Sequence, residues 1–566
     1  MEIKNSRRLT GTNLQGPGPS AIADVCFEAD EDAAASLDLW LQALARMCSR
    51  FGLDHCESFQ RTFEGGASIG FVAPIDQLYA ATEMNEWAIE AANALRLGQP
   101  EPDLETAVEH ITQSLEEELN PAVIALQRAA DHKDCPFLWD DDEISLGYGR
   151  HSQVWPARSL PDPATIDWQR YRPIPVALVT GTNGKTTTSR MLTRIMKTAG
   201  FTVGSTSTDG VCIDERVVEE GDWTGTGAAR LALRHTEVDA AVLETARGGL
   251  LRRGLAVERC DVAVVTNVAA DHLGDYGIHD VEAMAQVKNL ICAAVDQAGH
   301  RVINADDPRL TALLNQYDSP LILFGLDEAN PVIQTHCSRG GEAWLLSDDH
   351  LVQRIGDDEH RLMAAADMPC AFGGAARHNI SNALAASAAA SSLGLPLDKV
   401  AEALSGFGAA PQDNPGRCQL LEVAGRRLLL DFGHNPHGLE AILGLAQSLL
   451  DQRPNSRLCV SLGQAGDRLD EEILDLAATL AAVQPDQVII REMTGYERGR
   501  ADLEVPHLIQ AGLLSRGISA AQIKIVRDEV AALEAAMDCT QPGDLCMLLV
   551  HLEREQVAQW IEAQSP

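Results

Sequence analysis

The sequence predicts an α/β protein in three parts: an N-terminal α+β domain, a central nucleotide-binding domain of the P-loop type and a C-terminal Rossmann-like α/β domain. From Val176 onward, short apolar runs alternate with amphipathic helical segments, which is typical of a sheet covered by helices. A second series of the same kind begins near Leu420. A glycine-rich turn of the kind that binds nucleotide phosphates follows the first apolar run.

The glycine-rich turn occupies residues 178–188, which read Leu-Val-Thr-Gly-Thr-Asn-Gly-Lys-Thr-Thr-Thr. Gly181 and Gly184 allow a tight turn whose backbone N–H groups face phosphate oxygens. Lys185 can reach the terminal phosphates, and Thr186 can offer its hydroxyl to Mg²⁺. The strict P-loop pattern requires a further glycine upstream, where this chain has valine. A plain helix-capping turn is the alternative, but the strand–turn–helix context favours a phosphate site.

Length and proline content indicate the domain boundaries. The 566 residues are enough for three or four domains at about 150 residues per domain. Prolines concentrated between residues 156 and 175 indicate a linker before the central domain. We therefore expect an N-terminal domain over residues 1–160, a central domain over 161–412 and a C-terminal domain over 413–566.

The expected secondary structure follows from apolar periodicity. Runs that are apolar throughout indicate strands buried on both faces, as in parallel sheets. The N-terminal part has helical periodicity at Ala33–Phe51 and Met84–Leu97 and a strand-like run at Ala67–Ala73. The strands expected in the central domain are Val176–Val179, Ala240–Leu243, Val262–Val265, Arg301–Asn304 and Leu321–Phe324. Those expected in the C-terminal domain are Arg427–Asp431, Arg457–Leu462, Gln487–Ile490 and Leu545–Val550.

Composition excludes several classes of protein. Acidic residues outnumber basic ones 82 to 45, and the net charge of −37 argues against binding to nucleic acid or to anionic membranes. The 13 cysteines include no Cys-x-x-Cys pair, which favours buried thiols in a reducing cytoplasm over a disulfide framework or a zinc site. No uninterrupted apolar stretch reaches the roughly 18 residues of a membrane span.

Polar side chains follow the predicted strands at the edge where open α/β sheets bind ligands. Glu244 comes directly after one buried strand and is the first candidate for Mg²⁺, with a solvated loop carboxylate as the alternative. His272 follows the next strand, and its position favours a metal or phosphate role over a structural one. By pattern alone, Lys288 reads as an ordinary helix lysine.

Six motifs, in this order, resemble those of the Mur ligase superfamily. They are Gly181-Thr-Asn-Gly-Lys-Thr186, Thr266-Asn267 with Asp271-His-Leu273, Asn304-Ala-Asp-Asp-Pro308, Arg377-His-Asn-Ile-Ser-Asn382, Pro415-Gly-Arg417 and Asp431-Phe-Gly-His-Asn-Pro436. The resemblance covers about residues 173 to 560. Any one of these motifs would be weak evidence, whereas six in family order are very specific.

Within the superfamily, the chain is most similar to the ligase half of the cyanophycin synthetases. Leu243-Glu-Thr-Ala-Arg-Gly-Gly249 and Asp271-His-Leu-Gly274 carry this likeness. Ser6-Arg-Arg-Leu-Thr-Gly-Thr-Asn-Leu14 and Leu146-Gly-Tyr-Gly-Arg-His151 are similar to stretches that flank the N-terminal domain of that family. There an ATP-grasp module follows the second stretch, but here only some twenty residues precede the central domain. The resemblance therefore implies an enzyme that lacks one of that family's two ligation activities.

The resemblance implies an ATP-dependent ligase that activates a carboxylate as an acyl phosphate, which an amine then attacks. It assigns catalytic roles to Lys185, Glu244, His272 and Lys288, and implies that CO₂ carbamylates Lys288. Two Mg²⁺ ions would be held by Thr186, Thr206, Glu244, His272 and the modified Lys288. ATP would contact Gly181, Thr182, Asn183, Gly184, Lys185, Thr186, Thr187, His378, Asn379, Asn382, Arg417, Asp431 and His434.

The resemblance says less about the substrates. It implies an acidic amino acid or peptide as the carboxylate acceptor, an arginine- or lysine-like amine, and only weakly a homo-oligomer. Arg247, Arg252 and Arg253 are candidates to clamp the acceptor, and a solvated basic loop is the alternative. Asp467, Arg468, Arg498 and Arg500 are candidates to bind the incoming amino acid. A catalytically silent scaffold and a folylpolyglutamate-synthase-like ligase remain alternative functions.

Overall fold

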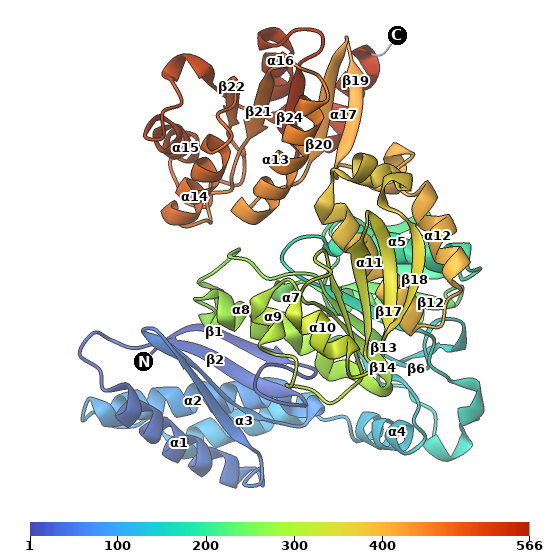
Figure 1. Cartoon of the computed structure of the whole chain (residues 1–566). Helices are drawn as coiled ribbons and strands as arrows, with labels where there is room; N and C mark the ends of the chain where they lie inside the picture. The colour runs from blue at the N-terminus through green and yellow to red at the C-terminus, as the bar shows by residue number, and fades with distance from the viewer. Residues whose placement is uncertain (565–566) are drawn as a thin grey trace. The chain divides into compact units, whose positions relative to one another are not determined.

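The computed structural model describes residues 1–564, which form two compact units (Figure 1). Unit 1 comprises Met1–Val268, Leu273–Leu323 and Ala385–Pro396. Unit 2 comprises Ala269–His272, Phe324–Leu384 and the chain from Leu397 onward. Each unit contains parallel strands and helices, so the predicted α/β fold class is confirmed. The boundaries at residues 160 and 412 stay a prediction.

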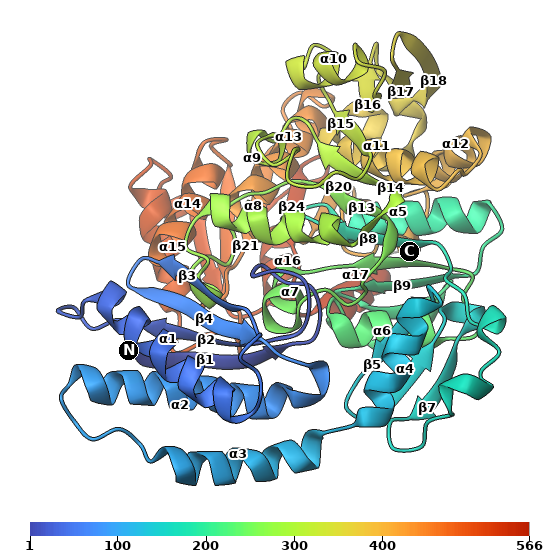
Figure 2. The ribbon, with the colours of Figure 1, turned by 90° about the horizontal axis from the view of Figure 1, so that it is seen from below.

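Unit 1 begins with a four-stranded antiparallel sheet in the order β1-β2-β4-β3, with helices packed on one face (Figures 1 and 2). Its core includes Trp40, whose indole Nε1 donates a hydrogen bond to Asn85 Oδ1 at 3.0 Å, so the buried polar group of each is satisfied. The elements are β1 Glu2–Leu9, β2 Ser20–Cys26, α1 Ala33–Arg50, β3 Ser58–Phe63, β4 Gly66–Val72, α2 Leu78–Arg96 and α3 Leu104–Glu118. The predicted helices and strand are found here.

A smaller subdomain leads from this sheet to the central one. It has an antiparallel sheet of order β5-β6-β7 and a helix whose N-cap Asn120 accepts a hydrogen bond from the Val123 N–H. The elements are α4 Pro121–His132, β5 Phe137–Trp139, β6 Glu143–Leu146 and β7 Gln153–Pro156. Between His151 and Val176 the chain otherwise forms only short 3₁₀ turns and irregular segments.

The central sheet of unit 1 has the strand order β11-β10-β9-β12-β8-β13-β14. Strands β9, β12, β8, β13 and β14 are parallel neighbours. Four of these strands were predicted, whereas β9 was not. Strands β10 and β11 add an antiparallel edge that the sequence did not reveal, because β11 is polar and largely exposed. The strands are β8 Val176–Thr180, β9 Val203–Ser207, β10 Gly210–Ile213, β11 Arg216–Glu220, β12 Ala240–Glu244, β13 Cys260–Val265 and β14 Val295–Asn304.

Helices alternate with these strands. Helix α5 packs against β8, β9 and β12. Because it begins only a short turn after β8, its first turn lies at the carboxyl end of that strand. The helices are α5 Lys185–Thr198, α6 Thr226–Arg234, α7 Arg247–Arg253, α8 Val281–Asn289 and α9 Pro308–Thr311. The chain passes from unit 1 to unit 2 within β15, Leu321–Gly325.

Unit 2 first forms an antiparallel meander that the sequence did not predict. Tight turns join its strands, and β18 carries charged, exposed residues, so it lacks the apolar run that marks a buried strand. The elements are α10 Pro331–Cys337, β16 Glu342–Ser347, β17 His350–Ile355, β18 Asp358–Ala364, α11 Arg377–Ser392 and α12 Leu397–Gly406.

Unit 2 ends in a six-stranded sheet of order β19-β20-β24-β21-β22-β23, parallel except at the β19 edge. Alternate side chains of its strands enter two cores, one with α13, α14 and α15 and one with α16 and α17. The strands are β19 Gln419–Val423, β20 Arg426–Asp431, β21 Leu458–Leu462, β22 Gln487–Arg491, β23 Ile523–Val526 and β24 Leu545–Leu549. The helices are α13 Pro436–Asp451, α14 Asp470–Ala481, α15 Glu504–Leu514, α16 Glu529–Cys539 and α17 Arg554–Gln564.

No helix within residues 1–564 is long and apolar enough to cross a membrane. All thirteen cysteines in this part of the chain are free thiols, and most are buried. Two of them lie close together in the C-terminal sheet, with Cys459 Sγ 3.8 Å from Cys539 Sγ. The hydrogen bond with Cys459 lowers the pKa of Cys539 to about 7.

We expect Cys539 to react with iodoacetamide at a rate that rises with pH around a midpoint near 7, because only the thiolate is nucleophilic. Cys370 is the internal control, since burial raises its pKa to about 12. Replacing Cys459 with alanine should move the Cys539 midpoint upward by removing the hydrogen bond. Mass spectrometry of the alkylated peptides measures each rate. Equal Cys539 rates at pH 6 and pH 8 would contradict the shift.

Candidate active site

The phosphate loop lies between β8 and α5, as predicted. Gly181 has φ 148° and Gly184, the N-cap residue of α5, has φ 83°. Both angles lie in a region that side chains with a Cβ seldom adopt, which is why the turn needs glycine there. Lys185 starts the helix, and its Nζ donates a hydrogen bond to the Thr182 carbonyl oxygen at 3.0 Å. The positive end of the α5 dipole and the Lys185 ammonium thus lie at the same turn.

The two residues that open the second motif, Thr266 and Asn267, hold this loop in shape. Thr266 Oγ1 donates a hydrogen bond to the Asn183 carbonyl oxygen at 2.6 Å. The Asn267 side chain accepts one from the Asn183 N–H at 2.9 Å and donates one to its carbonyl at 3.0 Å. Their position after a buried strand was visible in the sequence. The contact across 84 residues was not.

Glu244 is buried at the end of β12, with 2% of its surface exposed. Its Oε2 accepts a hydrogen bond from Thr186 Oγ1 at 2.9 Å, and its backbone carbonyl accepts a weaker one from Thr206 Oγ1 at 3.5 Å. Three predicted metal ligands therefore meet in unit 1. The alternative of a solvated loop carboxylate does not fit this burial.

Lys288 is buried, unlike an ordinary lysine on a helix surface, with 5% of its surface exposed. Its Nζ donates a hydrogen bond to the Gly181 carbonyl oxygen at 2.9 Å. The Lys288 side chain thus extends from α8 to the phosphate loop, a position that the sequence pattern did not reveal. Carbamylation of Lys288 stays a prediction.

The donor atoms in unit 1 fit a hard divalent cation. The carboxylate of Glu244 and the hydroxyls of Thr186 and Thr206 are oxygen ligands of the kind that Mg²⁺ prefers. The glycine turn fits phosphate, because it opens helix α5 with the Lys185 ammonium at the same turn. Gly181 keeps this turn closed, since a Cβ there would lie 1.8 Å from Thr266 Oγ1. These residues therefore fit the predicted Mg²⁺ and nucleotide phosphates.

The residues considered as a solvated basic loop, Arg247, Arg252 and Arg253, instead belong to helix α7, which begins at Arg247 and includes Gly248 and Gly249. Gly249 allows a close approach, since a Cβ there would lie 3.1 Å from Gly225 Cα. Arg247 is partly buried and pairs with Asp275 at 3.0 Å. Arg252 and Arg253, in contrast, are exposed at the end of the helix.

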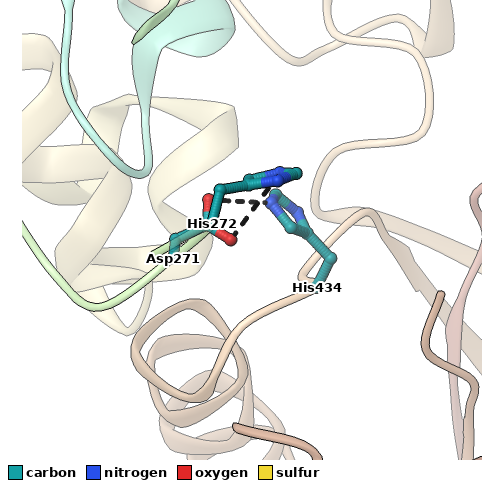
Figure 3. Close-up of side chains that lie close together, drawn as sticks. All are labelled: Asp271, His272 and His434. Atoms are coloured by element: carbon teal, nitrogen blue, oxygen red, sulfur yellow. Dashed lines mark ion pairs between the residues drawn. The ribbon is translucent and has the colours of Figure 1, made fainter. Parts of the chain in front are cut away.

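The remaining predicted site residues belong to unit 2. Figure 3 shows the imidazole rings of His272 and His434 close together beside the Asp271 carboxylate. His434 Nε2 lies 3.5 Å and His272 Nε2 lies 3.9 Å from the Asp271 carboxylate. Burial by itself raises the pKa of Asp271, but the two imidazoles and the Arg468 guanidinium outweigh burial and hold that pKa well below its ordinary value.

Asp271, His272 and His434 have the spacing of a metal site. Arg468 Nη1 and Nη2 also lie 3.0 and 2.7 Å from the two ring nitrogens of His272. A guanidinium at those nitrogens opposes a second cation on the same ring. In this arrangement Arg468 neutralises Asp271, and the metal role of His272 stays a prediction.

The residues predicted to lie near the ATP base form a second group in unit 2. His378 Nε2 lies 3.0 Å from Cys418 Sγ, and burial lowers the pKa of His378, which keeps its ring neutral at pH 7. Asn379 Nδ2 donates a hydrogen bond to the Cys370 carbonyl at 2.9 Å, and Asn382 Nδ2 donates to Asn379 Oδ1 at 3.4 Å. These side chains share one end of α11.

Asp431 and Arg417 frame the start of the C-terminal sheet. The Asp431 carboxylate accepts hydrogen bonds from the Cys418 N–H at 2.8 Å and the Gly433 N–H at 2.7 Å. The Arg417 guanidinium stacks over the Phe432 ring, 4.2 Å from its centroid. Both residues therefore order the β20 end, and their contact with ATP stays a prediction.

The candidates for binding the incoming amino acid differ in the contacts that their side chains make within the protein. Arg500 donates to the carbonyls of Gly466 and Arg468 at 2.9 and 2.7 Å, so it holds the loop after β21. Asp467 pairs with Arg468 at 3.0 Å. Arg498 is exposed and stacks over the Tyr496 ring.

Comparison with known proteins supports the family resemblance that the motifs indicated. Residues 179–390 match the Mur ligase middle domain and residues 416–549 match the Mur ligase glutamate ligase domain. Cyanophycin synthetase of Synechocystis sp. is 38% identical over 393 residues, which cover 69% of this chain and 44% of that protein. The one from Trichormus variabilis is 36% identical over 72% of this chain and 45% of its own length. The chain thus spans less than half the length of these relatives.

A solved structure shows the same fold. E. coli FolC in complex with DHPP and ADP has a TM-score of 0.51 at 20% identity, covering 69% of this chain and 89% of that one. At this identity the likeness concerns the fold alone. The ordered motifs, the two family domains and this fold agree. Through residues 179–390 and 416–549, the chain belongs to the Mur ligase superfamily.

Proposed function

We propose that this chain is an ATP-dependent carboxylate–amine ligase that forms an amide or isopeptide bond through an acyl phosphate. The observation that carries the proposal is the buried Glu244 carboxylate, hydrogen-bonded to Thr186 on the same turn of chain that presents Lys185. A buried carboxylate beside a phosphate-binding turn is the arrangement that phosphoryl transfer requires, because positioning and electrostatics supply most of the catalysis.

The proposed reaction has two steps. A carboxylate oxygen of the acceptor attacks the γ-phosphorus of ATP, and the bond to the β-phosphate oxygen breaks to release ADP. The amine nitrogen then attacks the acyl carbon, phosphate leaves with the C–O bonding pair, and the nitrogen loses a proton to solvent. Lys185 stabilises the charge on the transferring phosphoryl group, and the Gly181–Gly184 turn orients it.

Thr186, Thr206 and Glu244 are the residues of unit 1 that would hold Mg²⁺. When bound there, Mg²⁺ supplies charge neutralisation on the phosphate oxygens. We also propose that Lys288, once carbamylated, would supply an oxygen ligand to a second ion.

For the substrates we propose an acidic amino acid or peptide side chain as the acceptor and an arginine- or lysine-like amino acid as the amine. The likeness to cyanophycin synthetases supports this class. Arg247 supports the acceptor assignment, because it is a partly buried cation three residues after Glu244. A guanidinium there suits a carboxylate ligand.

The test measures ATP-dependent phosphate release by the purified protein with Mg²⁺, over pairs of acidic acceptors and amino acids. Aspartate and β-aspartyl peptides paired with arginine or lysine come first. We expect phosphate release that requires both partners and a product whose mass equals their sum less water. ATP binding without turnover for any pair would contradict the ligase proposal and favour a catalytically silent scaffold.

A further inference from the structure

Arg61 of the N-terminal sheet forms hydrogen bonds to a segment of the central domain, residues 274–279. Arg61 on β3 donates hydrogen bonds from Nη1 to the Gly277 carbonyl at 2.8 Å and from Nη2 to the Tyr276 carbonyl at 2.9 Å. The donor and its acceptors are more than 200 residues apart in the chain. This fork fixes two consecutive peptide units of the segment 274–279, which follows β13 and precedes α8.

Arg61 is itself held in place. Its Nη2 donates to Ser68 Oγ at 2.9 Å, and Ser68 Oγ donates to Asp24 Oδ1 at 2.6 Å. Asp24 forms an ion pair with Arg7, whose guanidinium stacks over the Tyr276 ring at 4.7 Å. Two arginines of the N-terminal sheet therefore contact the same residue of the segment.

The segment adopts a backbone that needs outside support. Tyr276 has φ 56°, Gly274 has φ 98° and Gly277 has φ 68°. A non-glycine residue at positive φ costs of order 1–3 kcal/mol and persists only where neighbouring structure holds it. The Phe63 ring covers Gly277 and lies 5.1 Å from the His279 ring. A cavity of about 350 Å³ borders the segment, so it has space to relax if it is released.

The segment connects to the proposed acceptor site. Asp275 pairs with Arg247 Nη2 at 3.0 Å, and Arg247 follows Glu244 by three residues. Each link lies within unit 1. A chain of direct contacts thus runs from Arg61 through Tyr276 and Gly277 to Asp275, and from there to Arg247.

We propose that Arg61 is a positioning residue for the ligase reaction, and that the N-terminal domain uses it to hold Asp275 and Arg247 in the geometry that binds the carboxylate acceptor. The expected effect on kinetics rests on the proposed ligase function. The hydrogen bonds between Arg61 and the segment do not depend on it. It assigns the N-terminal domain a direct part in catalysis by the central domain.

The test compares R61M with R50M in the full-length protein. Arg50 is the matched control because it lies in the same domain and pairs with Glu105 on the exposed side of α1. In R61M we expect the KM for the acceptor to rise roughly ten- to a hundredfold, because small misplacement of a binding group has effects of this size. ATP affinity without acceptor should stay unchanged, since the phosphate loop makes none of these contacts. R50M should behave as the parent.

Two further variants test the proposed series of contacts from Arg61 to Arg247. R61K, which keeps one charged donor, should recover part of the lost acceptor affinity. In an R247M background, R61M should add little further loss, because coupled residues give non-additive effects. Fully additive losses, or an equal loss of ATP and acceptor binding, would overturn the positioning role.

Hydrogen exchange provides a readout that does not require turnover. The Gly274 N–H donates to the Ile278 carbonyl at 2.7 Å and the Ile278 N–H to the Asp275 carbonyl at 3.1 Å. R61M should lose protection at these amides, and R50M should keep it. Unchanged protection in R61M would overturn the inference. Lost protection in a protein that ligates no pair would support the contact and contradict only the ligase proposal.

Discussion

Replacing Lys185 with alanine is expected to reduce ATP turnover by at least about a hundredfold, the usual cost of removing one preorganised charge from a phosphoryl-transfer site. Lys185 starts α5 at the glycine turn, and its ammonium donates a hydrogen bond to the Thr182 carbonyl of the same turn. Its loss therefore removes charge from the site and little packing. Phosphate release with the best substrate pair measures the effect.

The matched control is Lys197→Ala on the same helix, because Lys197 pairs with the exposed Glu215 near the last turn. That variant should keep parental turnover. Both variants should unfold within a few degrees of the parent by circular dichroism. Undiminished amide formation by Lys185→Ala would remove Lys185 from the catalytic machinery.

Replacing Gly181 with alanine is expected to abolish nucleotide binding and to destabilise the central domain by about 1–3 kcal/mol. An added Cβ would lie 1.8 Å from Thr266 Oγ1 and 3.1 Å from the Asn267 backbone nitrogen. Gly181 also has φ 148°, which disfavours a side chain whatever the space. Relief of the clash would push Thr266 away from the Asn183 carbonyl and open the loop. Calorimetric titration with ATP and chemical denaturation measure the two effects.

Gly444→Ala is the control substitution. Gly444 lies inside helix α13, is exposed, and has open space where a Cβ would be. Alanine there should raise the free energy of unfolding by about 0.5–1 kcal/mol through helix propensity and leave ATP binding unchanged. Parental ATP affinity in Gly181→Ala would show that the loop tolerates a side chain and would contradict the proposed cradle.

Sequence patterns predicted the buried strands well and the exposed ones poorly. Strands β8, β12 and β13 are apolar throughout because both faces are covered, and such runs are visible in one dimension. Strands β11 and β18 are mostly polar, and their pairing depends on neighbours rather than on their own composition. They were therefore missed.

By itself, the sequence determined the strand–turn–helix phosphate loop and placed Glu244 at the edge of the sheet, because both follow from local patterns within a few residues. Only the tertiary structure brought Lys288 to the Gly181 carbonyl and Thr266 to Asn183. It also showed that Arg61 holds the segment that pairs with Arg247. The contacts of Thr266, Lys288 and Arg61 join residues that are 83 to 216 positions apart. Such pairings arise from the packing of whole elements, which periodicity in one segment does not encode.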